Sequence, residues 1–406
     1  MDVTPGIRRE PGPDLDAVGD DEVLAARIHA EIQHDGPITF ARFMELALYD
    51  PERGYYRSGA DRPGRAGDFL TAPEAHPIFG ATLSRAVSDT WDRLGRPAAF
   101  VLRELGAGTG SLAIALLDAL ATERPDLARV IRYEPVELDP GRIERIRTRL
   151  EAAGHGDRLA AEHGHRPTTA ANAFIVANEV LDALPTHRLV QRGDSLREVL
   201  VGSDSGAFVD VEAEPTAPDL ATRLVAEGVV LVDGQRAEIC LALDGWVAGV
   251  ASGMERGVVI AIDYGYPATE LYDPGRRREG TLRAYLRHRV HDDPYAHVGR
   301  QDLTAHVDVT AVEQAMIDVG LEHLGTTTQS AFLVALGIED RLRAVQADPA
   351  TTIEAYLELR SSLVRMLDPA AMGRFRVIAG GRRWPPMASG EAREEPRLAG
   401  LPARTT

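Results

Sequence analysis

Several residue types and sequence features are scarce in this chain of 406 residues, and each scarcity excludes a class of protein. Lysine is absent, so all 45 basic residues are arginines, a composition typical of GC-rich bacterial genomes. The one cysteine, Cys240, excludes a disulfide framework and a thiolate metal cluster within a single chain. No apolar run is long enough to span a bilayer, and residues 1–20 lack the basic start and apolar stretch of a signal peptide. We therefore expect a cytoplasmic, bacterial protein without a membrane partner.

The balance of charge is acidic, with a formal net charge of -17. This charge argues against a general affinity for nucleic acid, whose phosphates need basic partners. The apolar fraction of 44% is ordinary for a globular enzyme and gives no sign of wholesale disorder. A chain of this length fits one large α/β domain, or such a core with a smaller subdomain. The sequence does not decide whether two copies of the chain form a homodimer.

Apolar patterns predict a mainly parallel sheet with helices between its strands. Strands are expected at residues 100–105, 130–137, 174–177 and 258–262, and core helices at 112–120, 142–150 and 308–319. Helical spacing also occurs earlier, at residues 22–33, 39–48 and 77–94. Near the end of the chain we expect an antiparallel pair at 322–324 and 331–336, a helix at 353–367 and a strand at 375–378.

The glycine-rich segment Glu104-x-Gly106-x-Gly108-x-Gly110 lies between the first expected strand and a helix. Glycines there let the backbone turn sharply and let a ligand press against it. The dinucleotide fingerprint has two residues in its last gap, whereas this segment has one. An acid two residues before the first glycine is typical of the first motif of class I methyltransferases. The segment therefore predicts a site for S-adenosylmethionine (SAM).

Acidic and polar residues follow the next two expected strands. Glu137 ends the second strand, where a carboxylate can accept hydrogen bonds from both ribose hydroxyls, and Glu134 is its competitor. Glu162 is a weaker candidate for the adenine. The third informative strand runs into Asn178 and Glu179, at the strand end where open α/β sheets bind ligands.

Several blocks in this order resemble the MidA-like family of SAM-dependent methyltransferases, which includes a mitochondrial complex I assembly factor. Besides the glycine segment they are GPITF (36–40), LYDP (48–51), GYY (54–56), GDFLTAPE (67–74), NEVLDALP (178–185), DYG (263–265), GTLRAY (280–285) and DLTAHVD (302–308). The resemblance spans roughly residues 22–380. It implies a class I, Rossmann-like methyltransferase fold with an N-terminal helical segment and an inserted substrate-side subdomain.

This architecture divides the chain into five parts. They are a disordered tail (1–20), an N-terminal helical or lid segment (21–96), the methyltransferase core (97–340) with insertions at about 187–255 and 266–308, a C-terminal helix and strand (341–384), and a disordered tail (385–406).

The resemblance also implies that Thr71, Pro73 and Glu74 lie near the cofactor, and that a protein arginine is the leading acceptor. Fold-level analogy does not fix a substrate. One departure bears on this point, because the family usually has two aromatic residues after Asn-Glu where this chain has Val180 and Leu181.

Carboxylates can pair with a guanidinium, orient it and localise its charge. We assign this catalytic task to Glu179 and Asp182, with Asn178 beside them at both the catalytic and the cofactor site. Further substrate contacts are expected from four residues on later blocks: Asp263, Tyr264, Tyr285 and His306. No metal site is expected, because the histidines near residue 290 fit no standard zinc spacing.

Three alternatives remain beside an enzyme that methylates protein or peptide arginine. The acceptor can instead be a small molecule, as in natural-product tailoring. A second alternative is an assembly or scaffolding factor that binds SAM without catalysis. The third, a nicotinamide oxidoreductase, predicts the two-residue glycine gap that this sequence lacks.

Overall fold

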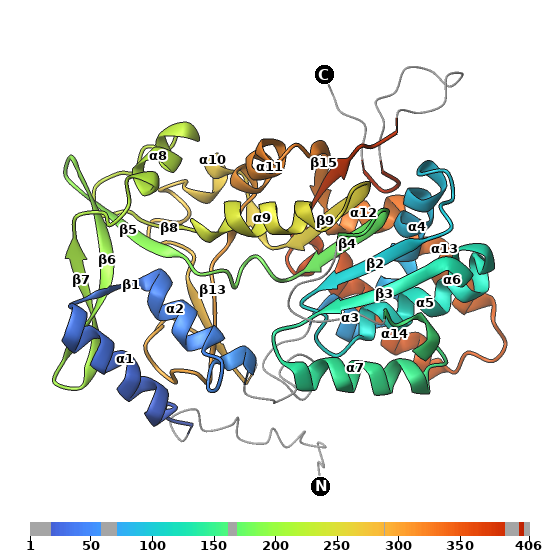
Figure 1. Ribbon diagram of the computed structural model, residues 1–406, viewed down its shortest axis with the longest axis horizontal. Coiled ribbons are helices and arrows are strands. Elements are labelled where there is room, and N and C mark those ends of the chain that lie inside the picture. The colour runs from blue at the N-terminus through green and yellow to red at the C-terminus, as the bar shows by residue number, and fades with distance from the viewer. Residues whose placement is uncertain (1–17, 58–70, 161–168, 288, 386–397, 402–406) are drawn as a thin grey trace, which may run out of the picture.

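The core of the computed structural model, which describes residues 18–57, 71–160, 169–287, 289–385 and 398–401, is a six-stranded sheet (Figure 1). Its strand order is β15-β16-β9-β4-β2-β3. The bounds are β2 (Phe100–Leu105), β3 (Ile131–Val136), β4 (Ala173–Asn178), β9 (Gly257–Asp263), β15 (Glu322–Thr328) and β16 (Arg376–Arg382). The pairs β3-β2, β2-β4 and β4-β9 are parallel, and β16 runs antiparallel to both of its neighbours.

Helices cover both faces of this sheet, because alternate side chains of its central strands are apolar on each side. Phe174 and Val176 of β4 pack into one buried cluster, whereas Ile175 and Ala177 pack into another. The first cluster is built with α4 (Ile78–Arg93), α5 (Ser111–Glu123), α6 (Pro125–Val130), α7 (Pro140–Ala152), α12 (Gln329–Ala335) and α14 (Ile353–Leu367). The second is built with α9 (Ala242–Ser252) and α11 (Val309–Asp318). This sandwich confirms the expected class I methyltransferase architecture.

A second body of structure lies beside the core sheet and is drawn at the left of Figure 1. Its five-stranded sheet contains β5 (His187–Arg192), β6 (Ser195–Asp204), β7 (Ala207–Ala213), β8 (Arg236–Ile239) and β1 (Ile38–Thr39). The N-terminal strand β1 pairs antiparallel with β6, so the N-terminal segment and the insertion share one sheet. Residues 242–252, which we expected inside the insertion, form α9 and pack against the core sheet.

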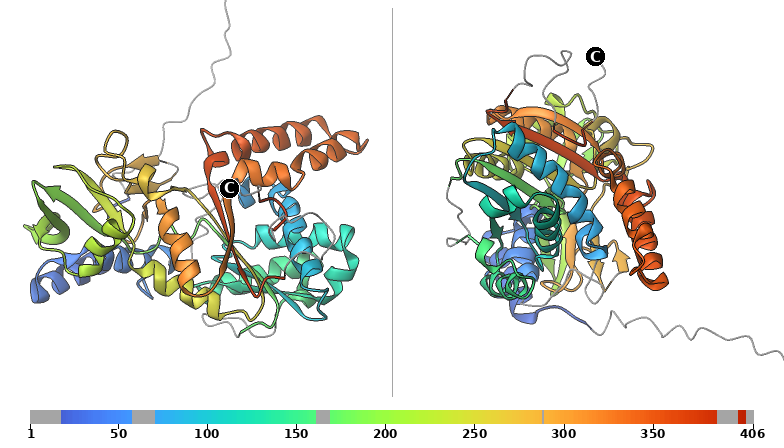
Figure 2. Two further views of the ribbon diagram at one scale, coloured as in Figure 1. Left: turned by 90° about the horizontal axis from the view of Figure 1, so that it is seen from above. Right: turned by 90° about the vertical axis from the view of Figure 1, so that its right-hand side faces the viewer.

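The remaining helices and strands lie around and between these two sheets (Figure 1 and Figure 2). The helices are α1 (Glu22–Asp35), α2 (Phe40–Tyr49), η1 (Tyr55–Arg57), α3 (Ala72–Ala75), η2 (Gly156–Arg158), α8 (Pro218–Ala226), α10 (Ala268–Leu271), α13 (Ile338–Ala347) and η3 (Met372–Arg374). The small strands are β10 (Gly265–Tyr266), β11 (Arg283–Leu286), β12 (Arg289–His291), β13 (Asp302–Thr304) and β14 (Val307–Asp308).

The end of the chain differs from the expectation in two places. Residues 331–336 were expected as a strand, but most of them belong to α12, which begins where the Thr328 side chain accepts a hydrogen bond from the amide of Ala331. A short apolar run fits either period, and this run buries Phe332 and Leu336 one helical turn apart. The strand that pairs with β15 is β16. Within the expected tail 385–406, residues 398–401 are packed, because Leu398 and Leu401 are buried against the core.

The described helices contain no segment that is both long and apolar enough to cross a membrane. Most of the first expected tail, residue Glu162 and residues 67–70 of the GDFLTAPE block lie outside the described residues.

Candidate active site

The turn from β2 into α5 needs glycine at its first positions. Gly106 and Gly108 have φ angles of 66° and 57°, which glycine adopts without the strain that a Cβ causes. A Cβ on Gly106 would lie 2.9 Å from Cγ2 of Val180 on the loop after β4. The turn and that loop are therefore packed closely, and Gly106 and Gly108 line a cavity beside them.

Gly110 has a different task from the one we expected. It has a φ of 78° at the start of α5, and a Cβ there would lie 3.1 Å from Ile146 of α7. It does not line the cavity that contains Gly106 and Gly108. Gly110 thus allows close helix packing, and its predicted contact with the cofactor stays a prediction.

The end of β3 carries the carboxylate that the sequence placed at a ribose. Oε1 of Glu137 accepts a hydrogen bond from the amide of Gly108 at 2.6 Å, and the guanidinium of Arg142 lies 3.7 Å from Oε2. The competitor Glu134 is instead buried in an ion pair with Arg103 at 2.7 Å. Of the two acids, only Glu137 reaches the cavity.

Glu104, the acid before the glycine turn, is buried at the end of β2 and lines the same cavity. The hydroxyl of Tyr133 donates a hydrogen bond to its Oε2 at 2.7 Å. Burial raises the pKa of Glu104 to about 8, and the neighbouring Glu137 and Glu74 carboxylates add to the rise. A carboxylate held in this way favours a positively charged ligand group, which would lower its pKa again.

The short helix α3 brings the lid segment onto the glycine turn. Thr71, Pro73 and Glu74 all line the cavity. The hydroxyl of Thr109 in the glycine turn donates a hydrogen bond to Oε1 of Glu74. The three residues that the resemblance placed near the cofactor therefore lie at the cavity wall.

Glu179 stands where β4 ends, and its backbone has a left-handed φ of 54°. Nδ2 of Asn178 donates a hydrogen bond to the Glu179 carboxyl at 3.0 Å, and the amide of Ala72 also bonds to it. Burial raises the pKa of Glu179 to about 8, and the charge of Asp182 raises it further. Non-glycine residues in this conformation cluster at functional sites, where the surrounding contacts hold them in place.

Asp263 holds the loop after β4 and does not face the main cavity. Its Oδ2 accepts hydrogen bonds from the amides of Val180, Leu181 and Asp182 at 3.1, 2.9 and 3.3 Å. These hydrogen bonds fix the backbone of residues 180–182 and thereby position Glu179, which directly precedes them. The structure therefore gives Asp263, which we expected at the substrate, a positioning role in this loop.

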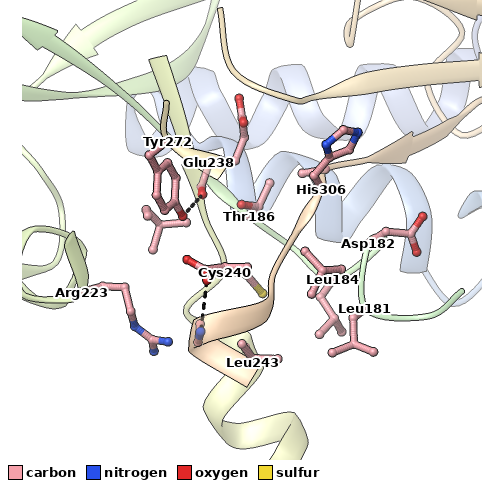
Figure 3. Close-up of a pocket in the computed structure, with 15 residues that line it drawn as sticks. Leu181, Asp182, Leu184, Thr186, Arg223, Glu238, Cys240, Leu243, Tyr272 and His306 are labelled. Atoms are coloured by element: carbon pink, nitrogen blue, oxygen red, sulfur yellow. Dashed lines mark hydrogen bonds between the residues drawn. The ribbon is translucent and has the colours of Figure 1, made fainter. Parts of the chain in front are cut away.

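Asp182 and His306 lie in a second, smaller cavity behind this loop (Figure 3). The hydroxyl of Tyr264 bonds to the Asp182 carboxyl, and the rings of Tyr264 and His306 pack edge to face at 5.3 Å. Burial raises the pKa of Asp182 to about 6 and lowers that of His306 to about 4. Tyr264 and Tyr285 line neither cavity. Asp182 can thus influence Glu179 by charge, but the four expected substrate contacts do not meet at the main cavity.

The main cavity is also lined by residues that the sequence had not assigned to the site. Those with large or polar side chains include Glu45, Tyr49, Tyr56, Thr109, Arg142 and Trp246. Tyr49 and Tyr56 lie in the quoted family blocks LYDP and GYY, so a signal for them was available. Glu45 on α2 and Trp246 on α9 reach the site only through the tertiary fold, and no local pattern marks them.

The main cavity has a volume of about 470 Å³, which suits a ligand of nucleoside size. The glycine turn forms part of the cavity wall, where the absence of side chains lets a ligand approach the backbone, and Glu137 can accept hydrogen bonds from ribose hydroxyls. Oδ1 of Asn178 is buried and has no hydrogen-bond partner among the described residues, so it can accept one from a ligand. The residues present therefore fit SAM: Glu104 would hold its amino group, the glycine turn would receive its methionine part, and Glu137 would hold its ribose.

Comparisons with known proteins point to the same cofactor. Residues 82–327 match the model of a family described as S-adenosyl-L-methionine-dependent methyltransferases. The mitochondrial protein arginine methyltransferase NDUFAF7 homologue of Drosophila melanogaster is 29% identical and covers 88% of this chain and 84% of its own length. The human protein arginine methyltransferase NDUFAF7 is 27% identical over 86% and 81%.

A solved structure is more similar still. It is the crystal structure of a COG1565 superfamily member from Burkholderia thailandensis bound to S-adenosyl-homocysteine (SAH). Its sequence is 35% identical, the TM-score is 0.84, and the match covers 95% of this chain and 98% of that one. These similarities confirm the family resemblance and the cofactor expected from the glycine turn. The chain belongs to this family of SAM-dependent methyltransferases.

Proposed function

We propose that this methyltransferase methylates a guanidinium nitrogen of an arginine in a protein or peptide. The observation that carries the proposal is the Glu179 carboxyl, which lines the SAM cavity and is fixed by Asn178 and the amide of Ala72. A carboxylate is the group that pairs with a guanidinium in a bidentate manner. The names of the fly and human relatives, which are protein arginine methyltransferases, support the same acceptor.

SAM supplies an electrophilic methyl group on its sulfonium, and the chain must supply alignment and a proton acceptor. A guanidinium is a weak nucleophile because its charge is spread over three nitrogens. In our proposal Glu179 accepts hydrogen bonds from two of its N–H groups, which draws the charge to that side and leaves the third nitrogen facing the donor. The pKa of about 8 for Glu179 suits a group that takes up the proton released on transfer.

Water has to be kept from this reaction, and the lid segment is arranged to exclude it. Glu74 of α3 is hydrogen-bonded to Thr109 of the glycine turn, and Tyr49 of α2 donates a hydrogen bond to the carbonyl of Ala183 at 2.7 Å. The lid is thus attached on both sides of the cavity, to the cofactor turn and to the loop that follows Glu179.

The test is transfer of a tritiated methyl group from SAM to a protein extract, followed by acid hydrolysis and chromatography. The proposal predicts labelled methylarginine. Label only in small molecules would favour a natural-product acceptor. No transferred label together with tight SAH binding would favour a binding factor without catalysis.

A further inference from the structure

Two tyrosines of the lid segment line the cavity beside the loop that follows β4. Tyr49 on α2 and Tyr56 on η1 both line it, with ring centroids 5.5 Å apart and ring planes tilted by 32°. Tyr49 contacts the loop after β4, because its hydroxyl donates to the carbonyl of Ala183. The pair therefore lies close to the loop that carries Glu179 and is attached to that loop by a hydrogen bond.

Both phenol groups already have protein partners. The Tyr56 hydroxyl donates to Oδ1 of Asp302 on β13 at 2.8 Å, as the Tyr49 hydroxyl does to Ala183. Burial raises the pKa of both phenols well above its ordinary value, and the Asp302 charge raises it further, so both stay neutral. Hydroxyl groups that are committed in this way do not serve as acids or bases for a bound acceptor. The part of each side chain left for a ligand is the aromatic ring.

The cavity wall around these rings carries carboxylates. Glu179 lies on the loop side, and Glu45, one turn before Tyr49 on α2, lines the cavity with an exposed side chain that is ion-paired with Arg42 at 2.8 Å. Tyr55 packs against Tyr56 with its centroid 5.0 Å away at an angle of 78°, which restrains that ring. Aromatic faces beside carboxylates attract cations, and a guanidinium stacks on such faces.

We propose that Tyr49 and Tyr56 form a cation-binding platform that receives the acceptor's guanidinium and presents it to Glu179. This inference rests on the proposed arginine acceptor and adds its specificity. An uncharged acceptor of the same shape lacks the electrostatic attraction to the ring faces, so the site favours a guanidinium over a neutral group.

The test uses the full chain loaded with SAH and labelled with ¹³C in the tyrosine rings. Methylguanidinium is titrated in, and methylurea, its uncharged counterpart of the same shape, is titrated separately. We expect methylguanidinium to shift the ring signals of Tyr49 and Tyr56, identified by their loss in Tyr→Phe variants, and methylurea to leave them unchanged. Equal shifts with both compounds, or shifts with neither, would overturn the platform.

Variants separate the ring from the hydroxyl. Replacement of Tyr49 and Tyr56 by Phe keeps the rings, and we expect methylguanidinium affinity within about threefold of the unmodified chain. Replacement of both by Leu should weaken it roughly tenfold or more, with SAH affinity unchanged. Tyr295→Leu is the matched control, because that hydroxyl also bonds a carboxylate, Asp210, away from the cavity. A loss of SAH binding in the double Leu variant would place the rings at the cofactor and contradict the inference.

Methyl transfer distinguishes failure of this inference from failure of the proposed function. If arginine is methylated by the double Leu variant with an unchanged KM for the acceptor, the function stands and the platform is wrong. If methylguanidinium binds as expected but no methylarginine forms, the platform stands and the acceptor chemistry is wrong. A raised KM with little change in kcat supports both.

Discussion

Oε1 of Glu137 lies 2.6 Å from the backbone nitrogen of Gly108, so the carboxylate at the end of β3 is hydrogen-bonded to the glycine turn after β2. The two segments that the sequence assigned to the cofactor are therefore one unit. SAM, the cofactor of the family, would contact both segments of this unit.

Glu137→Ala should weaken SAH binding by about 10- to 100-fold, because hydrogen bonds to a charged acceptor contribute roughly 1.5–3 kcal/mol. Isothermal titration measures the change. Glu134→Gln is the comparison: it leaves Arg103 buried without its charged partner and should cost roughly 3–5 kcal/mol of unfolding free energy. SAH affinity of the folded Glu134 variant should stay unchanged. Weaker SAH binding by the Glu134 variant, with unchanged binding by the Glu137 variant, would show that Glu134 and not Glu137 binds the ribose.

Gly106→Ala should reduce SAH affinity by at least about tenfold, because the new methyl group meets Val180 and a positive φ costs about 1–2 kcal/mol outside glycine. Gly154→Ala supplies the matched control, since Gly154 also has a positive φ, of 78°, but a Cβ there has nothing within 4 Å. Both variants carry the strain of the positive φ in thermal unfolding, and Gly106→Ala should lose more stability because of its contact with Val180. Equal SAH binding by both would show that the glycine turn does not press against the ligand.

The rate of transfer should depend on pH through Glu179. Its carboxyl is neutral below its pKa of about 8 in the empty site and anionic above it, and only the anion pairs with a guanidinium. We therefore expect kcat/KM for the acceptor to rise by up to about tenfold per unit below pH 8 and to level off above it. Asp182→Asn removes a repelling charge and should move this plateau to lower pH. A profile that falls between pH 6 and 8 would contradict the assignment.

Glu179→Gln should lower kcat by about 100-fold or more while SAH affinity stays within about threefold, because the amide can neither pair with the guanidinium as a charge nor take its proton. Initial rates of methylarginine formation provide the measurement. Glu255→Gln, a change at an exposed carboxylate away from the cavity, should leave kcat unaffected. Substantial activity in the Glu179 variant would show that another residue has the catalytic role.

Local patterns predicted the core well and the substrate side less well. The strands β4 and β9 are marked by continuous apolar runs, and β2 and β3 by apolar stretches that charged residues interrupt. The turn after β2 is marked by its glycines, so Glu104, Gly106, Gly108 and Glu137 could be placed from the sequence. Asp263 could not be interpreted correctly, because its partners are amides more than 80 positions earlier in the chain. The same holds for Glu45 and Trp246, which reach the cavity only when α2 and α9 are packed. The cytoplasmic location, the bacterial origin and the homodimer stay predictions.

A crystal structure of the chain with SAH and methylguanidinium tests the central claim most directly. The account predicts ribose hydroxyls within hydrogen-bonding distance of Glu137 and a sulfur atom facing the Glu179 carboxyl, with the guanidinium between them. A nucleoside bound away from the glycine turn, or a Glu179 side chain directed away from the sulfur, would contradict it.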